Sequence, residues 1–279
     1  MKQMLHLTFF VTLFFACDGK PESGELSSHD SKEKKEYSGI FIGFVNNTPV
    51  FFSDDSNFIF TVSLDKIPKV LKKCSEVQKP LFINDSGIIY LTGNGNDFYL
   101  IISKNGEPEI KVNLEKPAYS VTATNNLDTL VLCSDFEKEV LKLFVPAQNK
   151  ILTLPYRGSD PVIILNNVYF SSYIDTTGEG GYSGSNVYMA SLKNIDFKEL
   201  VVKDIFVNFF VSSDGTYIAS DFRKENGIKS GIYDTRKRTI NYIEKKENYN
   251  MAYFSKKENV FVFYSPANVI DNFICKIIK

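Results

Sequence analysis

The chain has 279 residues, a formal net charge of −1 at pH 7 and two histidines, His6 and His29. A nearly neutral chain without a basic stripe is not typical of nucleic-acid-binding proteins. Because both histidines precede residue 37, Ser-His-Asp and Cys-His catalysis are excluded for the rest of the chain, and we expect no zinc or copper site there.

An apolar run occupies residues 4–16 and ends at Cys17. A helix of about 13 residues is about 20 Å long, which is too short for a bilayer core of about 30 Å. Lys2 precedes the run and the small Ala16 ends it. Residues 1–16 therefore have the form of a secretory signal peptide.

The residues Phe14-Phe15-Ala16-Cys17 resemble the lipobox of bacterial lipoproteins, in which a small residue precedes a cysteine. Phe14 stands where that family usually has leucine. The resemblance implies that the Cys17 thiol is diacylated, that the signal is cut just before Cys17 and that the new amine is acylated. The acyl chains would then anchor the protein to a membrane of the bacterial cell envelope. The anchored body would face the periplasm or the cell surface. An ordinary signal peptide followed by an incidental cysteine is the alternative.

Residues 18–36 form a polar segment in which Leu26 is the only large apolar residue. Such a segment cannot bury enough apolar surface to offset the entropy of ordering it. We therefore predict a disordered tether over residues 17–37 and a folded domain over residues 38–279.

The folded part repeats one pattern of short apolar segments. Within residues 209–246 we expect strands at 209–212, 216–220, 231–233 and 239–243, with Asp214-Gly215 as a hairpin turn. Similar patterns occur at residues 50–73, 80–114, 119–154, 161–202 and 251–278. Their third strands are expected at residues 58–60, 98–100, 141–143, 187–189, 232–233 and 273–275. We find no segment with convincing helical periodicity.

About six copies of roughly 40 residues, each with four strands, are typical of a β-propeller. We therefore predict an all-β fold with a single propeller of about six four-stranded blades, five to seven being possible. Residues 38–45 read as a strand without a blade of its own, and the last copy offers three strands. We expect residues 38–45 to complete the last blade, because propellers often close with a strand from the other terminus.

The pattern SSDGTYIAS…GIYDTRKRTINYI, within residues 212–243, resembles the repeats of TolB-type propellers. The segment SGSNVYMASL, residues 183–192, is similar to the third strand of that repeat. The resemblance implies the same fold. The Trp-Asp signature of WD-type repeats is absent, since the chain has no tryptophan.

The remaining cysteines, four aspartates and a glycine-rich segment are further candidates for chemical roles. Cys74, Cys133 and Cys275 are expected to be unpaired, two of them as small hydrophobes in strands, although one disulfide plus one thiol is the alternative. The acidic residues Asp54, Asp55, Asp85 and Asp214 are expected to cap turns between first and second strands instead of binding calcium. The glycine-rich residues 177–185 are expected to form an enlarged loop. We predict no cofactor.

Propellers usually bind partners on the face that carries the loops between second and third strands and the connections between blades. On this face we place six candidate contact residues: Arg157, Asp160, Tyr173, Asp175, Tyr182 and Arg223. The predicted function is a non-catalytic binding or scaffold module for another envelope protein or an envelope polymer. The alternative is a carbohydrate-active enzyme with two carboxylates about 5–10 Å apart in a central funnel. A sensor for a small ligand or ion is a third hypothesis.

Overall fold

The computed structural model describes residues 37–62, 68–75, 78–94, 97–135, 138–173, 184–224, 227–244 and 250–276. The chain divides into two compact units, Met1–Lys35 and Glu36–Lys279, and all described residues belong to the second. The predicted signal peptide, Cys17 and residues 17–36 of the predicted tether therefore lie outside the described residues, and so do Asp175 and Tyr182.

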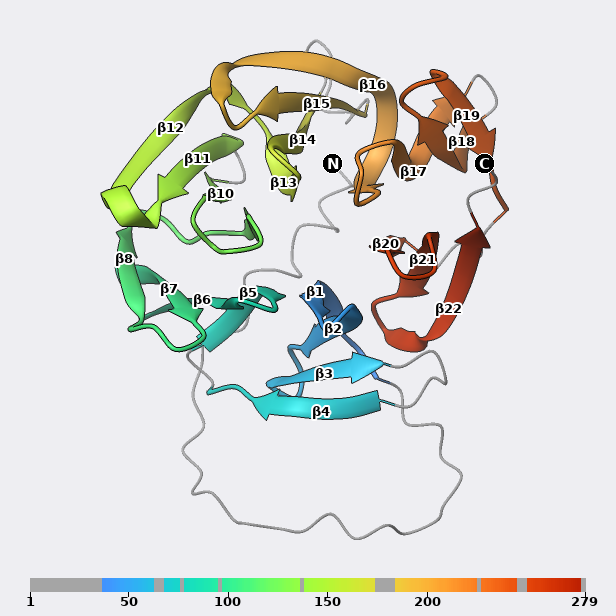
Figure 1. Cartoon of the computed structure of the whole chain (residues 1–279). Helices are drawn as coiled ribbons and strands as arrows, with labels where there is room; N and C mark the ends of the chain where they lie inside the picture. The colour runs from blue at the N-terminus through green and yellow to red at the C-terminus, as the bar shows by residue number, and fades with distance from the viewer. Residues whose placement is uncertain are drawn as a thin grey trace, which may run out of the picture. The chain divides into compact units, whose positions relative to one another are not determined.

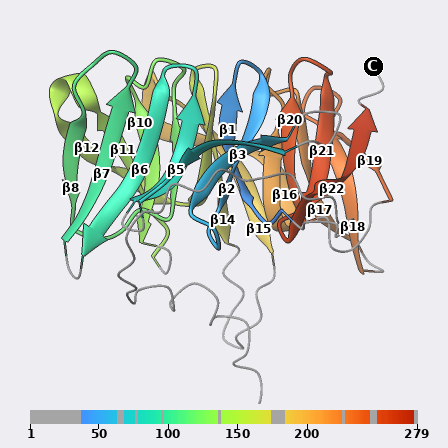
Figure 2. The same cartoon turned by 90° about the horizontal axis from the view of Figure 1, so that it is seen from below.

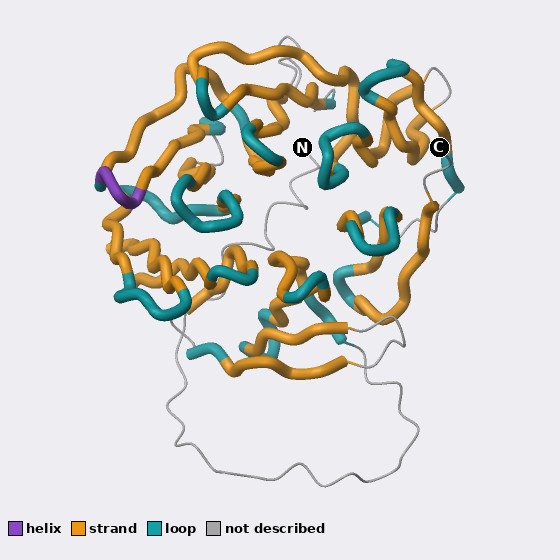
Figure 3. Tube along the Cα trace, viewed as in Figure 1, coloured by secondary structure: helices purple, strands orange, loops and turns teal. Residues whose placement is uncertain are grey.

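Most of the described residues lie in strands, labelled β1 to β22, and turns connect them, together with one short 3-10 helix, η1 (Pro146–Gln148) (Figure 3). None of the helical structure in this part of the chain is long and apolar enough to cross a membrane. The predicted all-β fold is confirmed.

The strands form six blades around a common axis (Figure 1). Blade one contains β1 (Ile40–Val45), β2 (Thr48–Ser53), β3 (Phe58–Val62) and β4 (Pro68–Lys73). Blade two contains β5 (Gln78–Asn84), β6 (Gly87–Asn94), β7 (Asp97–Lys104) and β8 (Ile110–Leu114). Blade three contains β9 (Ser120–Ala123), β10 (Leu130–Asp135), β11 (Val140–Val145) and β12 (Lys150–Arg157).

The remaining blades share one long strand. Blade four contains β13 (Ser159–Ile164), β14 (Asn167–Tyr173), β15 (Ser185–Ser191) and the first part of β16 (Asn194–Val211). Blade five contains the second part of β16, β17 (Tyr217–Lys224), β18 (Gly227–Asp234) and β19 (Thr239–Tyr242). Blade six contains β20 (Met251–Ser255), β21 (Val260–Ser265) and β22 (Asn268–Lys276). The six predicted third strands are all confirmed, as β3, β7, β11, β15, β18 and β22.

Apolar clusters fill the six interfaces between neighbouring blades. Strand β10 shows how one sequence serves two interfaces, because successive side chains of a strand point to opposite faces. Leu130 and Leu132 pack in the cluster between blades two and three, whereas Val131 and Cys133 pack in the cluster between blades three and four. Each blade is therefore apolar on both faces and needs a neighbour on each side, which ring closure supplies.

The predicted role of residues 38–45 is wrong. These residues contain β1, which pairs antiparallel with β2 and meets β5 in parallel at Gly43 and Ile83, so β1 is the inner strand of blade one. Blade six has three strands among the described residues. The assignment of Asp54 and Asp55 to a first-to-second-strand turn is also wrong, since they lie between β2 and β3.

The seam between blades six and one closes through aromatic side chains and three hydrogen bonds. Phe51, Phe60 and Tyr264 belong to the apolar cluster at this seam. The Gly39 N–H donates to Pro266 O at 2.8 Å, and the Val269 N–H donates to Tyr37 O at 2.9 Å. The Phe41 N–H donates to Tyr264 Oη at 2.9 Å. Side-chain packing thus closes the ring where a strand exchange was expected.

Candidate functional site

An axial cavity of about 780 Å³ runs through the middle of the ring. One inner strand from each blade lines it: β1, β5, β9, β13, the second part of β16, and β20. The strands run along the axis (Figure 2), so the cavity has two ends. One end lies at the turns between first and second strands, and the other, which we call the loop-face mouth, lies where the inner strands begin.

Three of the predicted contact residues gather at the loop-face mouth, in blades three and four. Arg157 ends β12, Asp160 lies near the start of β13, and Tyr173 ends β14. Arg157 and Tyr173 are both exposed. Arg223 is exposed on β17 in blade five, one blade further round the ring. Of the four predicted contact residues that the structure describes, three therefore lie close together.

A buried carboxylate that the sequence did not indicate lies among these three residues. Glu139 precedes β11 and is 7% exposed. Its Oε1 accepts a hydrogen bond from the Tyr173 N–H at 3.4 Å. Burial raises the pKa of Glu139 and the negative charge of Asp160 raises it further, whereas the Tyr173 N–H and the positive charge of Arg157 oppose the shift. Arg157, Asp160 and Tyr173 thus interact with one buried group.

The backbone geometry of Asp160 is set by local features of β13. The register of β13 against β14 shifts between Ser159 and Val162, which marks a bulge. Asp160 itself has a φ of 50°, in the left-handed region that Asp tolerates better than most residues. Bulges re-aim side chains next to functional sites, and Asp160 lines the axial cavity.

Two serine hydroxyls hold the Asp160 carboxylate. Ser159 Oγ donates to Asp160 Oδ2 at 3.2 Å and Ser171 Oγ donates to the same oxygen at 3.4 Å. The side chain is exposed to the cavity, but the cavity walls crowd it and limit its hydration, which raises the pKa of Asp160. The two serine hydroxyls oppose this rise because they stabilise the carboxylate.

Gly158 permits the close crossing from blade three to blade four. A Cβ atom at this position would lie 2.4 Å from Phe170 Cδ2 and 2.9 Å from Leu141 Cδ1, both in the core between the two blades. The Gly158 N–H donates to Glu139 O at 2.8 Å. Glycine therefore lets the chain bring Arg157 and Asp160 to the same place as Glu139.

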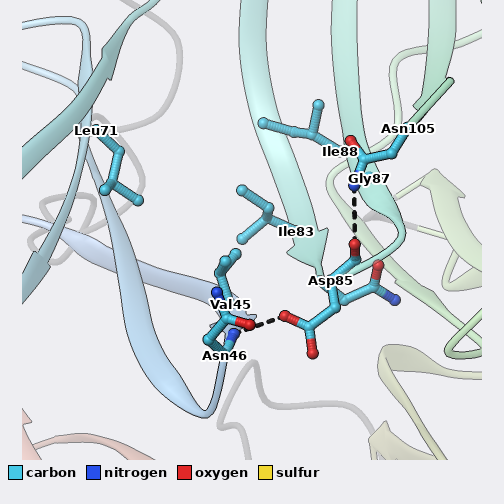
Figure 4. A pocket seen from close by; sticks show the side chains of 9 residues that line it. Val45, Asn46, Leu71, Ile83, Asp85, Gly87, Ile88 and Asn105 are labelled. Carbon is cyan, nitrogen blue, oxygen red and sulfur yellow. Dashed lines mark hydrogen bonds between the residues drawn. The ribbon is translucent and has the colours of Figure 1, made fainter.

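The opposite end of the cavity has structural polar contacts. Asp85 Oδ1 accepts the Asn46 N–H at 2.6 Å, and Asp85 O accepts Asn105 Nδ2 at 2.8 Å (Figure 4). A smaller cavity of about 360 Å³ lies beside these residues, where Leu71 of β4 and Ile83 of β5 face it (Figure 4). Asp85 therefore ties the first turn of blade one to blade two.

Asp214 behaves as the turn prediction expected. Its carboxylate accepts hydrogen bonds from Ser212 Oγ at 2.7 Å, from the Thr216 N–H at 3.0 Å and from Thr216 Oγ1 at 2.8 Å. These donors outweigh the opposing effect of partial burial and lower the pKa of Asp214. Within the described ranges, no group of three or more Cys, His, Asp or Glu side chains gathers as a metal site.

The cysteines whose side chains are described lie in blades one and three. Cys133 is buried in the core between blades three and four, with its Sγ 3.8 Å from Gly158 O, and its reading as a small buried hydrophobe is confirmed. Cys74 is a half-buried thiol, and burial raises its pKa. The side chain of Cys275 lies outside the described residues.

No protein-family model matches the chain, and no curated protein matches it either. Solved structures resemble it in fold. TolB from Acinetobacter baumannii is 11% identical with a TM-score of 0.52, over 80% of this chain and 63% of that protein. The Swd1 β-propeller domain of Myceliophteria thermophila is 9% identical with a TM-score of 0.55, over 85% and 83% of the two chains. An oligogalacturonate lyase from Vibrio parahaemolyticus is 12% identical with a TM-score of 0.51, over 88% and 91%.

At these identities the likeness shows the fold alone, and it confirms the expected resemblance to TolB-type propellers at that level. This chain spans 63% of the length of the Acinetobacter TolB. Because a lyase shares the fold, the architecture by itself does not separate a binding module from an enzyme.

Proposed function

We propose that this protein is a lipid-anchored binding module of the bacterial cell envelope, which holds another envelope protein or an envelope polymer at the loop-face mouth of its propeller. One observation carries the proposal: the Tyr173 backbone N–H and the charges of Arg157 and Asp160 all act on the buried carboxylate of Glu139, and Arg157 and Tyr173 are both exposed beside it. Arg and Tyr are enriched among the residues that dominate binding energy in interfaces. Asp175 and Tyr182 belong to the same proposed face and Arg223 extends it to blade five.

The membrane anchor is the part of the proposal that the first residues support. Cys17 follows an apolar run and a small residue. Diacylation would hold the protein firmly, because two acyl chains bind a bilayer much more strongly than one.

The Cys17→Ala chain is expected to leave the membrane fraction and appear in the soluble or secreted fraction. The reason is that the substitution removes the only thiol at the end of the apolar run. Cell fractionation with immunoblotting measures this, and Cys74→Ala is the matched control, which should stay in the membrane fraction. Membrane retention of the Cys17→Ala chain would contradict the anchor.

The partner face is tested with a variant in which Arg157 and Tyr173 are both replaced by serine. The Tyr173 N–H that reaches Glu139 belongs to the backbone and survives the change. We expect recovery of the partner from detergent-solubilised envelopes to fall at least about tenfold, since each anchor contributes on the order of 1–2 kcal/mol. The recovered proteins and polymers are quantified by mass spectrometry and carbohydrate analysis.

The matched control is Leu165→Ser, at the turn between β13 and β14. Leu165 is 71% exposed. It directly follows β13, the inner strand that carries Asp160 near its start, so it lies at the end of the cavity opposite the loop-face mouth. Its replacement should leave recovery unchanged. Equal loss in both variants, or loss in Leu165→Ser alone, would place the partner elsewhere on the propeller.

Catalysis by two carboxylates has less support. Among the described lining residues, the carboxylates are Asp85 and Asp160. Asp85 lies in the first-to-second-strand turn of blade two. The equivalent turn of blade four begins at Leu165, and Asp160 lies five residues before it. Five strand residues extend about 16 Å, which exceeds the separation that paired glycosidase carboxylates need. Glu139 is buried and is not a lining residue.

A further inference from the structure

The lining of the axial cavity suits a small-molecule ligand, which differs in kind from the proposed envelope partner at the surface. Its walls are largely apolar, because inner strands such as Leu81–Ile83, Val162–Ile164 and Phe209–Val211 contribute most of the lining. Its volume of about 780 Å³ is within the range of small-molecule sites. Such sites combine apolar walls with a few polar groups that fix the orientation of the ligand.

The charged groups of the described lining are unevenly distributed. Asp85 and Lys256 both lie in first-to-second-strand turns, at the same end of the cavity. There, the Asp85 carboxylate already accepts a hydrogen bond from the Asn46 N–H. Asp160 is the charged lining residue near the other end. Asp160 is therefore the charged side chain of the described lining at the loop-face end, whereas Arg157 lies at the mouth and is not a lining residue.

The Asp160 carboxylate has no cationic partner among the described residues. Both serine hydroxyls bind Oδ2, and Oδ1 accepts no hydrogen bond from the described part of the chain. A carboxylate in a confined apolar cavity is costly unless an opposite charge compensates it.

Aromatic side chains supply the wall for the rest of a ligand. The rings of Phe41 and Tyr253 are stacked with centroids 5.1 Å apart, and both residues line the cavity. Phe44 contacts both rings edge-on, at 5.0 Å from Phe41 and 5.8 Å from Tyr253. Aromatic faces attract both apolar groups and organic cations.

We propose that the axial cavity binds small organic ammonium ions, with the Asp160 carboxylate as the counter-ion and the inner-strand side chains as the apolar wall. The ligand class is a primary amine carried on an aromatic or aliphatic body. The ammonium group donates to the open Oδ1 of Asp160, and the body extends along the cavity. This inference concerns the interior of the ring and holds whether or not a partner binds the loop face.

The test compares two probes that differ only in charge and terminal atom, 3-phenylpropylamine and 3-phenylpropanol. Each is titrated calorimetrically into the purified full-length protein at neutral pH. We expect the amine to bind saturably and at least about tenfold more tightly than the alcohol, since a tenfold ratio needs only one modest charge-assisted contact. Equal affinities, or no saturable binding of the amine, would overturn the proposal.

Asp160→Asn identifies the counter-ion. Asn tolerates the left-handed backbone and its carbonyl oxygen still accepts the serine hydroxyls, so this variant should melt no lower than the wild type. It should reduce the affinity for the amine to that of the alcohol. Asp85→Asn is the matched control and should retain the wild-type preference. Unchanged amine binding in Asp160→Asn, or an equal loss in Asp85→Asn, would contradict the assignment.

Discussion

Replacement of Gly43 by alanine should destabilise the propeller by more than about 4 kcal/mol, a loss at the severe end for single substitutions. A Cβ atom at this position would lie 1.8 Å from Ile83 O, a backbone atom that cannot rotate away. The φ of Gly43 is 148°, which side-chain-bearing residues rarely adopt. The collision would push β1 away from β5 and open the junction between blades one and two. The midpoint of guanidinium unfolding, followed by far-UV circular dichroism, measures the loss.

Gly227→Ala is the matched control for Gly43→Ala. Gly227 also has a positive φ, 119°, but a Cβ atom there would meet nothing within 4 Å. It should therefore show backbone strain alone, on the order of 1–2 kcal/mol. If the two variants unfold at the same denaturant concentration, the contact between β1 and β5 does not hold the blades together.

Phe51→Ala should cost about 3–5 kcal/mol, the usual range for removing a buried aromatic side chain. Phe51 is 1% exposed at the seam between blades one and six. Its ring contacts Phe60 at 5.6 Å and Tyr264 at 5.4 Å between centroids. This aromatic cluster packs blade six against blade one, where the ring closes. Equilibrium unfolding in denaturant checks the size of the loss.

The control for Phe51→Ala is Phe197→Ala on β16. Phe197 is 73% exposed, so its removal should change stability by less than about 0.5 kcal/mol. A large effect at Phe197 together with a small one at Phe51 would mean that the seam is not where the ring is stabilised.

Much of the fold could be predicted because each blade repeats one local pattern. Third strands are apolar and lie between a loop and a turn, and they recur at intervals of roughly 40 residues, so all six were found. The long strand β16 was not expected, because its residues change from the outer strand of one blade to the inner strand of the next without a turn signal. Ile205 marks the change, since it pairs with Ser185 on one side and Phe222 on the other.

The role of β1 could not be predicted from local pattern. The pattern of residues 38–45 predicts a strand. Which strands lie beside it depends on the contact of Gly43 with Ile83, 40 residues further along the chain. The signal that could have revealed it is Gly43, a glycine in the middle of an apolar strand. Such a glycine often marks a bulge or a close approach of another backbone, and both occur here.

The loop-face rule predicted Arg157, Asp160 and Tyr173 on one face, and the structure brings these three residues together, while their role in binding stays a prediction. Glu139 was missed because an acidic residue in a polar loop is usually exposed. The Glu139 backbone meets the crossing at Gly158, whose N–H donates to Glu139 O, and no local pattern encodes this contact. The serines that hold Asp160 were missed for a similar reason, since Ser171 reaches it from the neighbouring strand β14.

The most direct test of the binding face is photo-crosslinking in intact envelopes, with p-benzoylphenylalanine placed at either end of the cavity. One chain carries it at Tyr173, which is 41% exposed at the loop-face mouth. The other carries it at Leu165, which is 71% exposed at the turn end. Irradiation should yield a discrete higher-mass adduct from position 173 and none from position 165. An adduct from position 165 alone, or none from position 173, would contradict the account.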